Sequence, residues 1–260
     1  MPNPALEVSL RHQAGPLDLD VQFTLDAPWT CLFAPSGAGK TTILRMIAGL
    51  DHPQTGRVVR APGSVLRVVL LDTDSRIFIP PHLRSVRMVA QRPALFPHLS
   101  VVDNVDYRMP PSLPEYENDD LLGPGLRLAE ITGLCRVSHL LAKMPSQLSG
   151  GERQRVALAR ALASSFPADP LLLDEPFTGL EASLRDDIIH DLRIWTAERS
   201  IPVLLVTHDL GEVFAANAHV LKMDSGRIVA QGPAAEVLAE ERVRLIQRLQ
   251  SGTSKLSAHS

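Results

Sequence analysis

The sequence predicts an α/β fold in which helices cover a mostly parallel sheet. Short apolar runs with β character alternate with longer helical patterns along the chain, and this alternation is typical of parallel strands joined by helices. A glycine-rich segment at residues 34–42 stands between one such run and the helical pattern that follows. The composition fits a globular protein, with 45% hydrophobic and 21% charged residues in a chain of 260.

The individual elements follow from the spacing of apolar residues. Apolar runs predict strands at residues 29–33, 65–71, 86–90, 171–173, 203–206 and 219–223. Helical periodicity predicts helices at residues 40–50, 126–133, 152–164 and 184–198, with a further helix-like stretch from residue 234. Between residues 106 and 125 the chain is acidic and rich in proline, which predicts an exposed loop inside a helical insertion.

The composition also excludes several classes of protein. A formal net charge of −3 shows no basic surplus, so we expect no nucleic acid partner. Cys31 and Cys135 stand far apart, which favours reduced buried thiols over a disulfide framework or a metal knuckle. No run reaches the roughly 18 apolar residues that span a bilayer. We therefore expect a protein that is neither secreted nor a membrane channel and that contacts membranes through another protein.

The glycine-rich segment matches a phosphate-binding loop. It consists of Ala34, Pro35, Ser36, Gly37, Ala38, Gly39, Lys40, Thr41 and Thr42. Gly37 and Gly39 allow successive backbone N–H groups to face phosphates, and Lys40 adds a positive charge at the β and γ phosphates. The Thr41 hydroxyl is an expected Mg²⁺ ligand. The alternative is a glycine-rich turn that caps a helix. Ala34 replaces the first glycine of the usual pattern, which a negative φ would permit.

Two adjacent acids end the apolar run at residues 171–173. Strands of an open parallel sheet deliver their last residues to the site crevice, so Asp174 and Glu175 are expected there. Because side chains alternate along a strand, the two carboxylates should point in different directions. We expect Asp174 to join the Mg²⁺ shell and Glu175 to orient or deprotonate an attacking water. The alternative is a turn with two solvated acids.

A third motif opens the helix predicted at residues 152–164. Ser149 and Glu152 have the spacing of a capping box, which predicts that Ser149 caps the helix. A cap does not explain Gly150 and Gly151, since glycine weakens a first helical turn. The close approach of a phosphate to a helix N-terminus does explain them.

Residues 148–154 resemble the signature sequence of ATP-binding cassette (ABC) ATPases, and with the other two motifs the resemblance covers about residues 29–232. It implies a P-loop ATPase core with an N-terminal antiparallel β subdomain and a helical insertion subdomain. The expected ATPase domain is 1–233, with the helical subdomain at about 92–165 and a short helical tail at 234–260. In this family the signature of one subunit faces the phosphate loop of another. We therefore expect a homodimer in which Ser149, Gly150 and Gly151 contact the ATP of the partner.

The resemblance implies roles for two further residues. Gln91, after the strand at residues 86–90, matches the glutamine that senses Mg²⁺ and the attacking water, and His208 matches the histidine that contacts the γ-phosphate. The expected catalytic residues are Glu175, His208 and Gln91, and the expected metal ligands are Thr41, Gln91 and Asp174. Glu181 stands where the family usually has Asp. Arg11-His12-Gln13 stands near the usual aromatic partner of adenine, so the adenine contact is unassigned.

Residues 92–101 resemble the same stretch in importers of the maltose, sulfate and molybdate groups, where it helps to form a groove for a helix of the membrane permease. Residues 15–21 are similar to the ATPase subunits of molybdate importers. Those subunits carry an additional small β-barrel domain, and after Gln231 this sequence continues only into its short helical tail.

The resemblance thus implies an ATP-hydrolysing, Mg²⁺-dependent subunit at the cytoplasmic face of the inner membrane. Its expected partners are a second copy of itself, integral membrane permease subunits and, indirectly, a periplasmic solute-binding protein. The expected cargo is molybdate or a related oxyanion. Open alternatives are sulfate, a polyamine or a sugar as cargo, a P-loop kinase, and an ABC ATPase that acts on DNA or ribosomes.

Overall fold

The computed structural model describes residues 4–107 and 124–256. Within these residues, eleven strands form one sheet in the order β6-β5-β4-β1-β2-β11-β10-β3-β9-β8-β7. Their bounds are β1 Leu6–Ala14, β2 Leu17–Leu25, β3 Trp29–Phe33, β4 Thr55–Arg60, β5 Val68–Asp72, β6 Ile77–Phe78, β7 Arg87–Val89, β8 Leu171–Asp174, β9 Val203–Thr207, β10 His219–Asp224 and β11 Arg227–Pro233.

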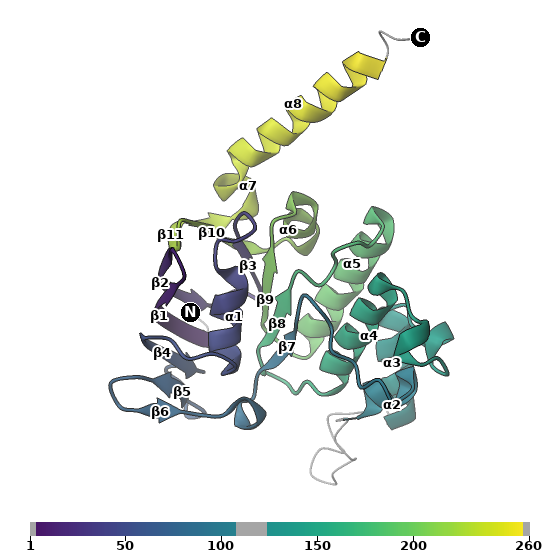
Figure 1. Cartoon of the computed structure of the whole chain (residues 1–260), viewed down its shortest axis with the longest axis horizontal. Helices are drawn as coiled ribbons and strands as arrows, with labels where there is room; N and C mark the ends of the chain where they lie inside the picture. The colour runs from purple at the N-terminus through teal and green to yellow at the C-terminus, as the bar shows by residue number, and fades with distance from the viewer. Residues whose placement is uncertain (1–3, 108–123, 257–260) are drawn as a thin grey trace.

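The helices cover the sheet and fill the segment between β7 and β8 (Figure 1). Their bounds are α1 Lys40–Ala48, α2 Val101–Asp106, α3 Pro124–Leu134, α4 Gly150–Ala163, α5 Ala182–Glu198, α6 Leu210–Ala216, α7 Ala234–Val237 and α8 Ala239–Leu256. The loop predicted between residues 106 and 125 lies outside the described residues except at its ends.

The predicted α/β fold is confirmed, and the sheet is mixed. Strands β10, β3, β9, β8 and β7 pair in parallel and form the core. The N-terminal strands β1, β2, β4, β5 and β6 pair in antiparallel fashion, as expected for the β subdomain. β5 begins at Val68, later than predicted, because Ala61 and Gly63 turn the chain with positive φ and Val65 is fully exposed.

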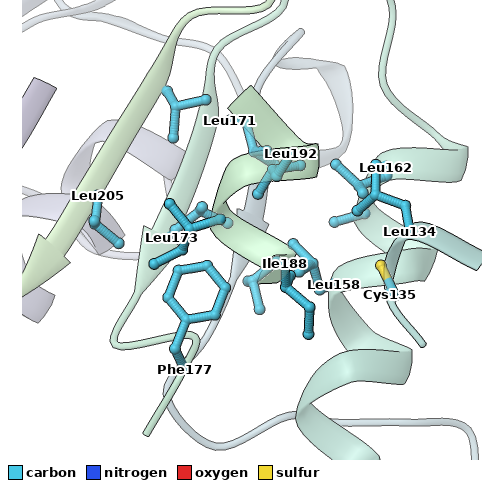
Figure 2. Packing of buried hydrophobic residues seen from close by; sticks show 14 of the residues in the cluster. Leu134, Cys135, Leu158, Leu162, Leu171, Leu173, Phe177, Ile188, Leu192 and Leu205 are labelled. Atoms are coloured by element: carbon cyan, nitrogen blue, oxygen red, sulfur yellow. The ribbon is translucent and has the colours of Figure 1, made fainter. Parts of the chain in front are cut away.

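Alternation along the parallel strands separates two hydrophobic clusters. Leu171 and Leu173 of β8 join the cluster that packs against α4 and α5. Leu172 faces the other way and joins the cluster that contains α1. Figure 2 shows the first cluster, with strand leucines meeting Leu158 of α4 and Ile188 of α5. Consequently α1 and α4 lie on opposite faces of the parallel strands.

Both cysteines are buried free thiols, as predicted, and burial raises the pKa of each. Helix α8 extends away from the rest of the chain in Figure 1. The helices in the described ranges include none with the length and apolar character needed to cross a membrane.

Candidate functional site

The predicted site residues from separate motifs meet at one edge of the sheet. The loop after β3, the acids at the end of β8 and His208 after β9 all lie at the carboxyl ends of neighbouring parallel strands. Gln91 follows β7 on the other side of β8. Ligands of open α/β sheets bind in the crevice at this edge. The topology therefore places these side chains beside one another.

Two glycines shape the loop between β3 and α1. Gly37 and Gly39 have φ values of 82° and 90°, which favour glycine. A Cβ at Gly39 would lie 2.5 Å from Leu19 Cδ2, whereas the space around Gly37 is open. Ala34 is not among the described residues with positive φ, so its methyl group is compatible with the backbone. The loop thus keeps its curled form despite the missing first glycine.

Lys40 is folded back onto this loop. Its Nζ donates to the carbonyl oxygens of Ala34 at 2.7 Å and Pro35 at 2.8 Å. The side chain is almost completely buried. Burial lowers the pKa of Lys40, while the charges of Glu175 and Asp174 oppose that change. An ammonium group with two carbonyl partners in a buried site is well placed to exchange them for phosphate oxygens.

Asp174 and Thr41 form a site that fits a hard cation. The Thr41 hydroxyl donates to Asp174 Oδ1 at 3.1 Å, and Asp174 is 1% exposed. The second carboxylate oxygen, Oδ2, is buried without a hydrogen-bond partner. Burial raises the pKa of Asp174, the Thr41 hydrogen bond opposes this, and the charge of Glu175 adds to it. A carboxylate and a hydroxyl are oxygen ligands of the kind that Mg²⁺ prefers.

Glu175 lies between the other two predicted catalytic residues. Gln91 Nε2 donates to Glu175 Oε2 at 3.0 Å, and His208 Nδ1 lies 3.1 Å from Glu175 Oε1. Glu175 has a φ of 45°, in the left-handed region that residues with a Cβ rarely adopt. Such backbone conformations concentrate at functional sites. The unusual turn carries Glu175 out of the strand and toward both partners.

The signature segment lies elsewhere. Ser149 caps α4 by accepting from the Glu152 N–H at 3.2 Å, and Glu152 Oε2 accepts from the Ser149 N–H at 2.7 Å, so the predicted capping box is confirmed. A Cβ added to Gly150 would meet nothing within 4 Å. Because α1 and α4 cover opposite faces of the parallel strands, the structure does not bring Gly150 and Lys40 to one phosphate within a chain.

Comparison with known proteins settles the family. The family described as ABC transporter matches residues 20–178, which is more than half of the chain. The chain belongs to the ABC transporter family. The solved structure of cbiO1 from Clostridium perfringens, part of an ABC transporter complex, has a TM-score of 0.69 and 24% identity and covers 98% of this chain and 99% of its own. A dimeric bacterial ABC transporter cassette gives the same TM-score of 0.69 and 24% identity, over 88% of this chain and 98% of its own. These likenesses show the fold of an ABC cassette.

Two curated relatives are more similar in sequence. The molybdenum import ATP-binding protein ModC of Mesorhizobium japonicum is 36% identical over 247 residues, which cover 92% of this chain and 62% of the relative. That of Rhizobium meliloti is 39% identical over 236 residues, covering 90% of this chain and 62% of the relative. The chain thus spans about three fifths of the length of these relatives.

The structure of this ABC family member reveals supporting residues that the motifs did not predict. Gln154 of α4 donates to the carbonyl of Ala90, next to Gln91, and so connects the signature helix to the site. Asn104 of α2 is fully buried and accepts from the Phe96 N–H at 2.8 Å. The two hydrogens of its amide nitrogen are shared among three nearby carbonyls, those of Phe96, Leu99 and Ser100. In the sequence, the only sign of this role is a single asparagine among the apolar residues of a short helix, because its burial is visible only in the structure.

Proposed function

We propose that the chain is the ATP-hydrolysing subunit of an ABC importer, with its ATPase domain at residues 1–233 and its helical subdomain at about 92–165. It converts ATP and water to ADP and phosphate and couples this reaction to solute uptake. The observation that carries the proposal is the hydrogen-bonded set of Gln91, Glu175 and His208 beside the Lys40 loop. A phosphate-binding loop next to a buried acid with two positioning partners is suited to activating water.

The proposed reaction uses each of these residues. ATP phosphates bind the N–H groups of residues 34–42, and Lys40 leaves the Ala34 and Pro35 carbonyls for the β and γ phosphates. Glu175 accepts a proton from the water whose oxygen attacks the γ-phosphorus, and the bond to the β-phosphate oxygen breaks. His208 contacts the γ-phosphate. Thr41, Asp174 and Gln91 would hold Mg²⁺, which when bound neutralises charge on the phosphate oxygens.

We place the signature residues in a second copy of the chain. Ser149, Gly150 and Gly151 start a capped helix whose N–H groups suit an anion. Helix α4, which they start, covers the face of the sheet opposite to α1. A phosphate held by Lys40 of one chain therefore contacts the signature residues of the other chain, across a head-to-tail dimer. The open space beside Gly150 supports this arrangement, because a phosphate needs close access to the backbone. ATP then closes the dimer, and hydrolysis with phosphate release reopens it.

The proposed transport partners are inferred from residues 95–100, the segment that the hydrogen bonds of Asn104 hold in place. Residues 95–100 form a turn whose Phe96 ring contacts Tyr107, and Tyr107 is 56% exposed. We propose that this apolar surface receives a helix of an integral membrane permease at the cytoplasmic face of the inner membrane. A periplasmic solute-binding protein takes part indirectly. The relatives named for molybdenum import support molybdate or a related oxyanion as the cargo.

Uptake measurements test the transport proposal. Membrane vesicles that contain this chain, its permease and the binding protein are expected to take up molybdate only when ATP is supplied. His98→Glu, in the exposed part of the groove segment, should lower uptake severalfold while the isolated chain keeps its ATPase rate, because a charge there hinders docking. His82→Glu, also exposed but outside the segment, is the matched control.

The alternatives give different results in the same system. Uptake of sulfate, a polyamine or a sugar in place of molybdate would change the assigned cargo. Phosphate transfer to a small acceptor would indicate a kinase. Purification of the chain on ribosomes or DNA, with no effect of ATP on uptake, would refute the importer assignment.

A further inference from the structure

Glu212 is a buried acid that the proposed reaction does not use. It lies in the first turn of α6 and is 4% exposed, and its Oε2 is buried without a hydrogen-bond partner. Burial raises the pKa of Glu212 to about 7. A buried carboxylate with an unsatisfied oxygen opposes folding when it is ionised. The ionised form of Glu212 therefore does not serve stability at this position.

Its hydrogen bonds lead to the catalytic histidine. The Thr207 hydroxyl accepts from the Asp209 N–H at 3.0 Å. A hydroxyl has one hydrogen to donate, and that of Thr207 goes to the Glu212 carboxylate. Thr207 and Asp209 are the two neighbours of His208 in the chain. Through Thr207, Glu212 thus contacts the turn from which the His208 ring reaches Glu175 at 3.1 Å.

Several charged groups surround Glu212. Asp209 and His208 face it from the turn, Arg185 from α5 and the Cys31 thiol from β3. Arg185 is engaged elsewhere, since its Nη1 lies 3.4 Å from Asp209 Oδ2 and its Nε donates to Asp186. Among the described residues no basic side chain forms an ion pair with Glu212. The Thr207 hydroxyl is therefore the side-chain contact that binds the ionised form of Glu212 more strongly than the neutral form.

We propose that Glu212 is a positioning residue for His208, and that its ionised carboxylate holds the His208 turn in the geometry required for hydrolysis. The inference rests on the proposed function, because it assumes that His208 takes part in ATP hydrolysis. Hydrogen bonds to an ionised acceptor are about twice as strong as neutral ones, so the ionised form holds Thr207 best. Burial disfavours the same form. Hydrolysis and stability consequently favour opposite charge states of one side chain.

The variant Glu212→Gln separates these two effects. The folded pKa of Glu212 is raised above the ordinary glutamate value of 4.5, so folding loses stability as pH rises from there through about 7. A neutral glutamine avoids this loss. At about pH 8.5 we expect Glu212→Gln to have a higher Tm than the wild type, with the difference closing toward pH 5. At the same high pH its kcat for ATP should fall about fivefold, because a neutral acceptor holds Thr207 less firmly.

The pH profile and the Thr207 variants complete the test. The wild-type kcat should decline as pH falls through about 7, and Glu212→Gln should lose most of that dependence. Thr207→Val should reproduce the loss of kcat, Thr207→Ser should retain the wild-type rate, and the double variant Glu212→Gln/Thr207→Val should be no slower than either single variant. A residue that only supports the fold would lose Tm and kcat together.

Two results overturn the proposal. A lower Tm for Glu212→Gln at high pH would show that the ionised acid stabilises the fold, and an unchanged kcat would show that it does not position His208. His208→Ala tests the role of His208 separately from the role of Glu212. If His208→Ala keeps full hydrolysis, the proposed role of His208 fails and that of Glu212 fails with it. If His208→Ala is slow while Glu212→Gln is fast, the Glu212 proposal alone fails.

Discussion

Glu175→Gln should bind ATP and hydrolyse it roughly 100-fold to 1,000-fold more slowly than the wild type. The amide retains the size of the side chain and can still form hydrogen bonds with Gln91 and His208, which lie at 3.0 and 3.1 Å from the carboxylate. It cannot accept the proton of the attacking water. ATP that is bound but not hydrolysed should keep two chains together, so gel filtration with ATP and Mg²⁺ should show a dimer that the wild type forms only briefly.

Glu130→Gln is the matched control. Glu130 is also a carboxylate with an N–H partner, since Arg199 donates to it at 3.1 Å, but the pair is partly exposed and far from the site in sequence. Exposed pairs contribute at most about 1 kcal/mol, so this variant should fold and hydrolyse ATP normally. A Glu175→Gln chain that hydrolyses ATP within tenfold of the wild type, or that stays monomeric with ATP, contradicts the assigned role.

Arg84→Met should have the largest effect on stability, lowering the free energy of unfolding by about 3 kcal/mol or more. Arg84 is 2% exposed, and its guanidinium donates to the carbonyls of Ile79 at 2.7 Å, Met46 at 3.0 Å and Ile47 at 2.6 Å. Burial lowers its pKa to about 10, so the group is charged at neutral pH. Methionine would remove the Arg84 donor from the buried Ile79 and Ile47 carbonyls, while the Met46 carbonyl would keep only the Gly49 N–H at 3.1 Å.

Urea denaturation measures this change directly. Two of the three carbonyls end α1, so the loss should also loosen the helix that follows the phosphate-binding loop. Arg57→Met is the comparison, because Arg57 pairs with Asp72 at 3.5 Å while 46% exposed, and its loss should cost less than about 1 kcal/mol. Equal effects of the two substitutions would refute the role assigned to Arg84.

Local sequence patterns were sufficient to predict the residues at the sheet edge. The glycines, Lys40, Asp174 and His208 each follow an apolar strand, and parallel strands bring their carboxyl ends together whatever the length of chain between them. The antiparallel strand β2 also has a readable pattern, since Leu19, Val21, Phe23 and Leu25 alternate toward the core. The fold class could therefore be predicted from patterns within short stretches of the sequence.

The supporting residues could not be predicted in this way. Arg84 reaches Met46 and Ile47 from more than thirty positions away, and a single arginine in a loop gives no local sign of burial. Glu212 looks like an ordinary acid in a first helical turn, where it suits the helix dipole. Only its tertiary burial and the bond to Thr207 show that it is linked to the site. Such roles depend on tertiary contacts.

The central claim is that each ATP site combines the phosphate loop of one chain with the signature of another. Two variants disable the two halves separately. Lys40→Ala removes the ammonium group of the loop. Gly150→Asp places a carboxylate where the partner's phosphate would lie, and the fold should tolerate it because the added Cβ meets nothing within 4 Å and acids suit the first turn of a helix.

Mixing the two inactive variants is the most direct measurement. Each mixed dimer pairs the intact loop of the Gly150→Asp chain with the intact signature of the Lys40→Ala chain. If half of the dimers are mixed and each has one complete site, ATP hydrolysis should return to about a quarter of the wild-type rate. If each chain instead completed its own site, the mixture would show only the summed residual rates of the two variants, and the shared-site account would be wrong.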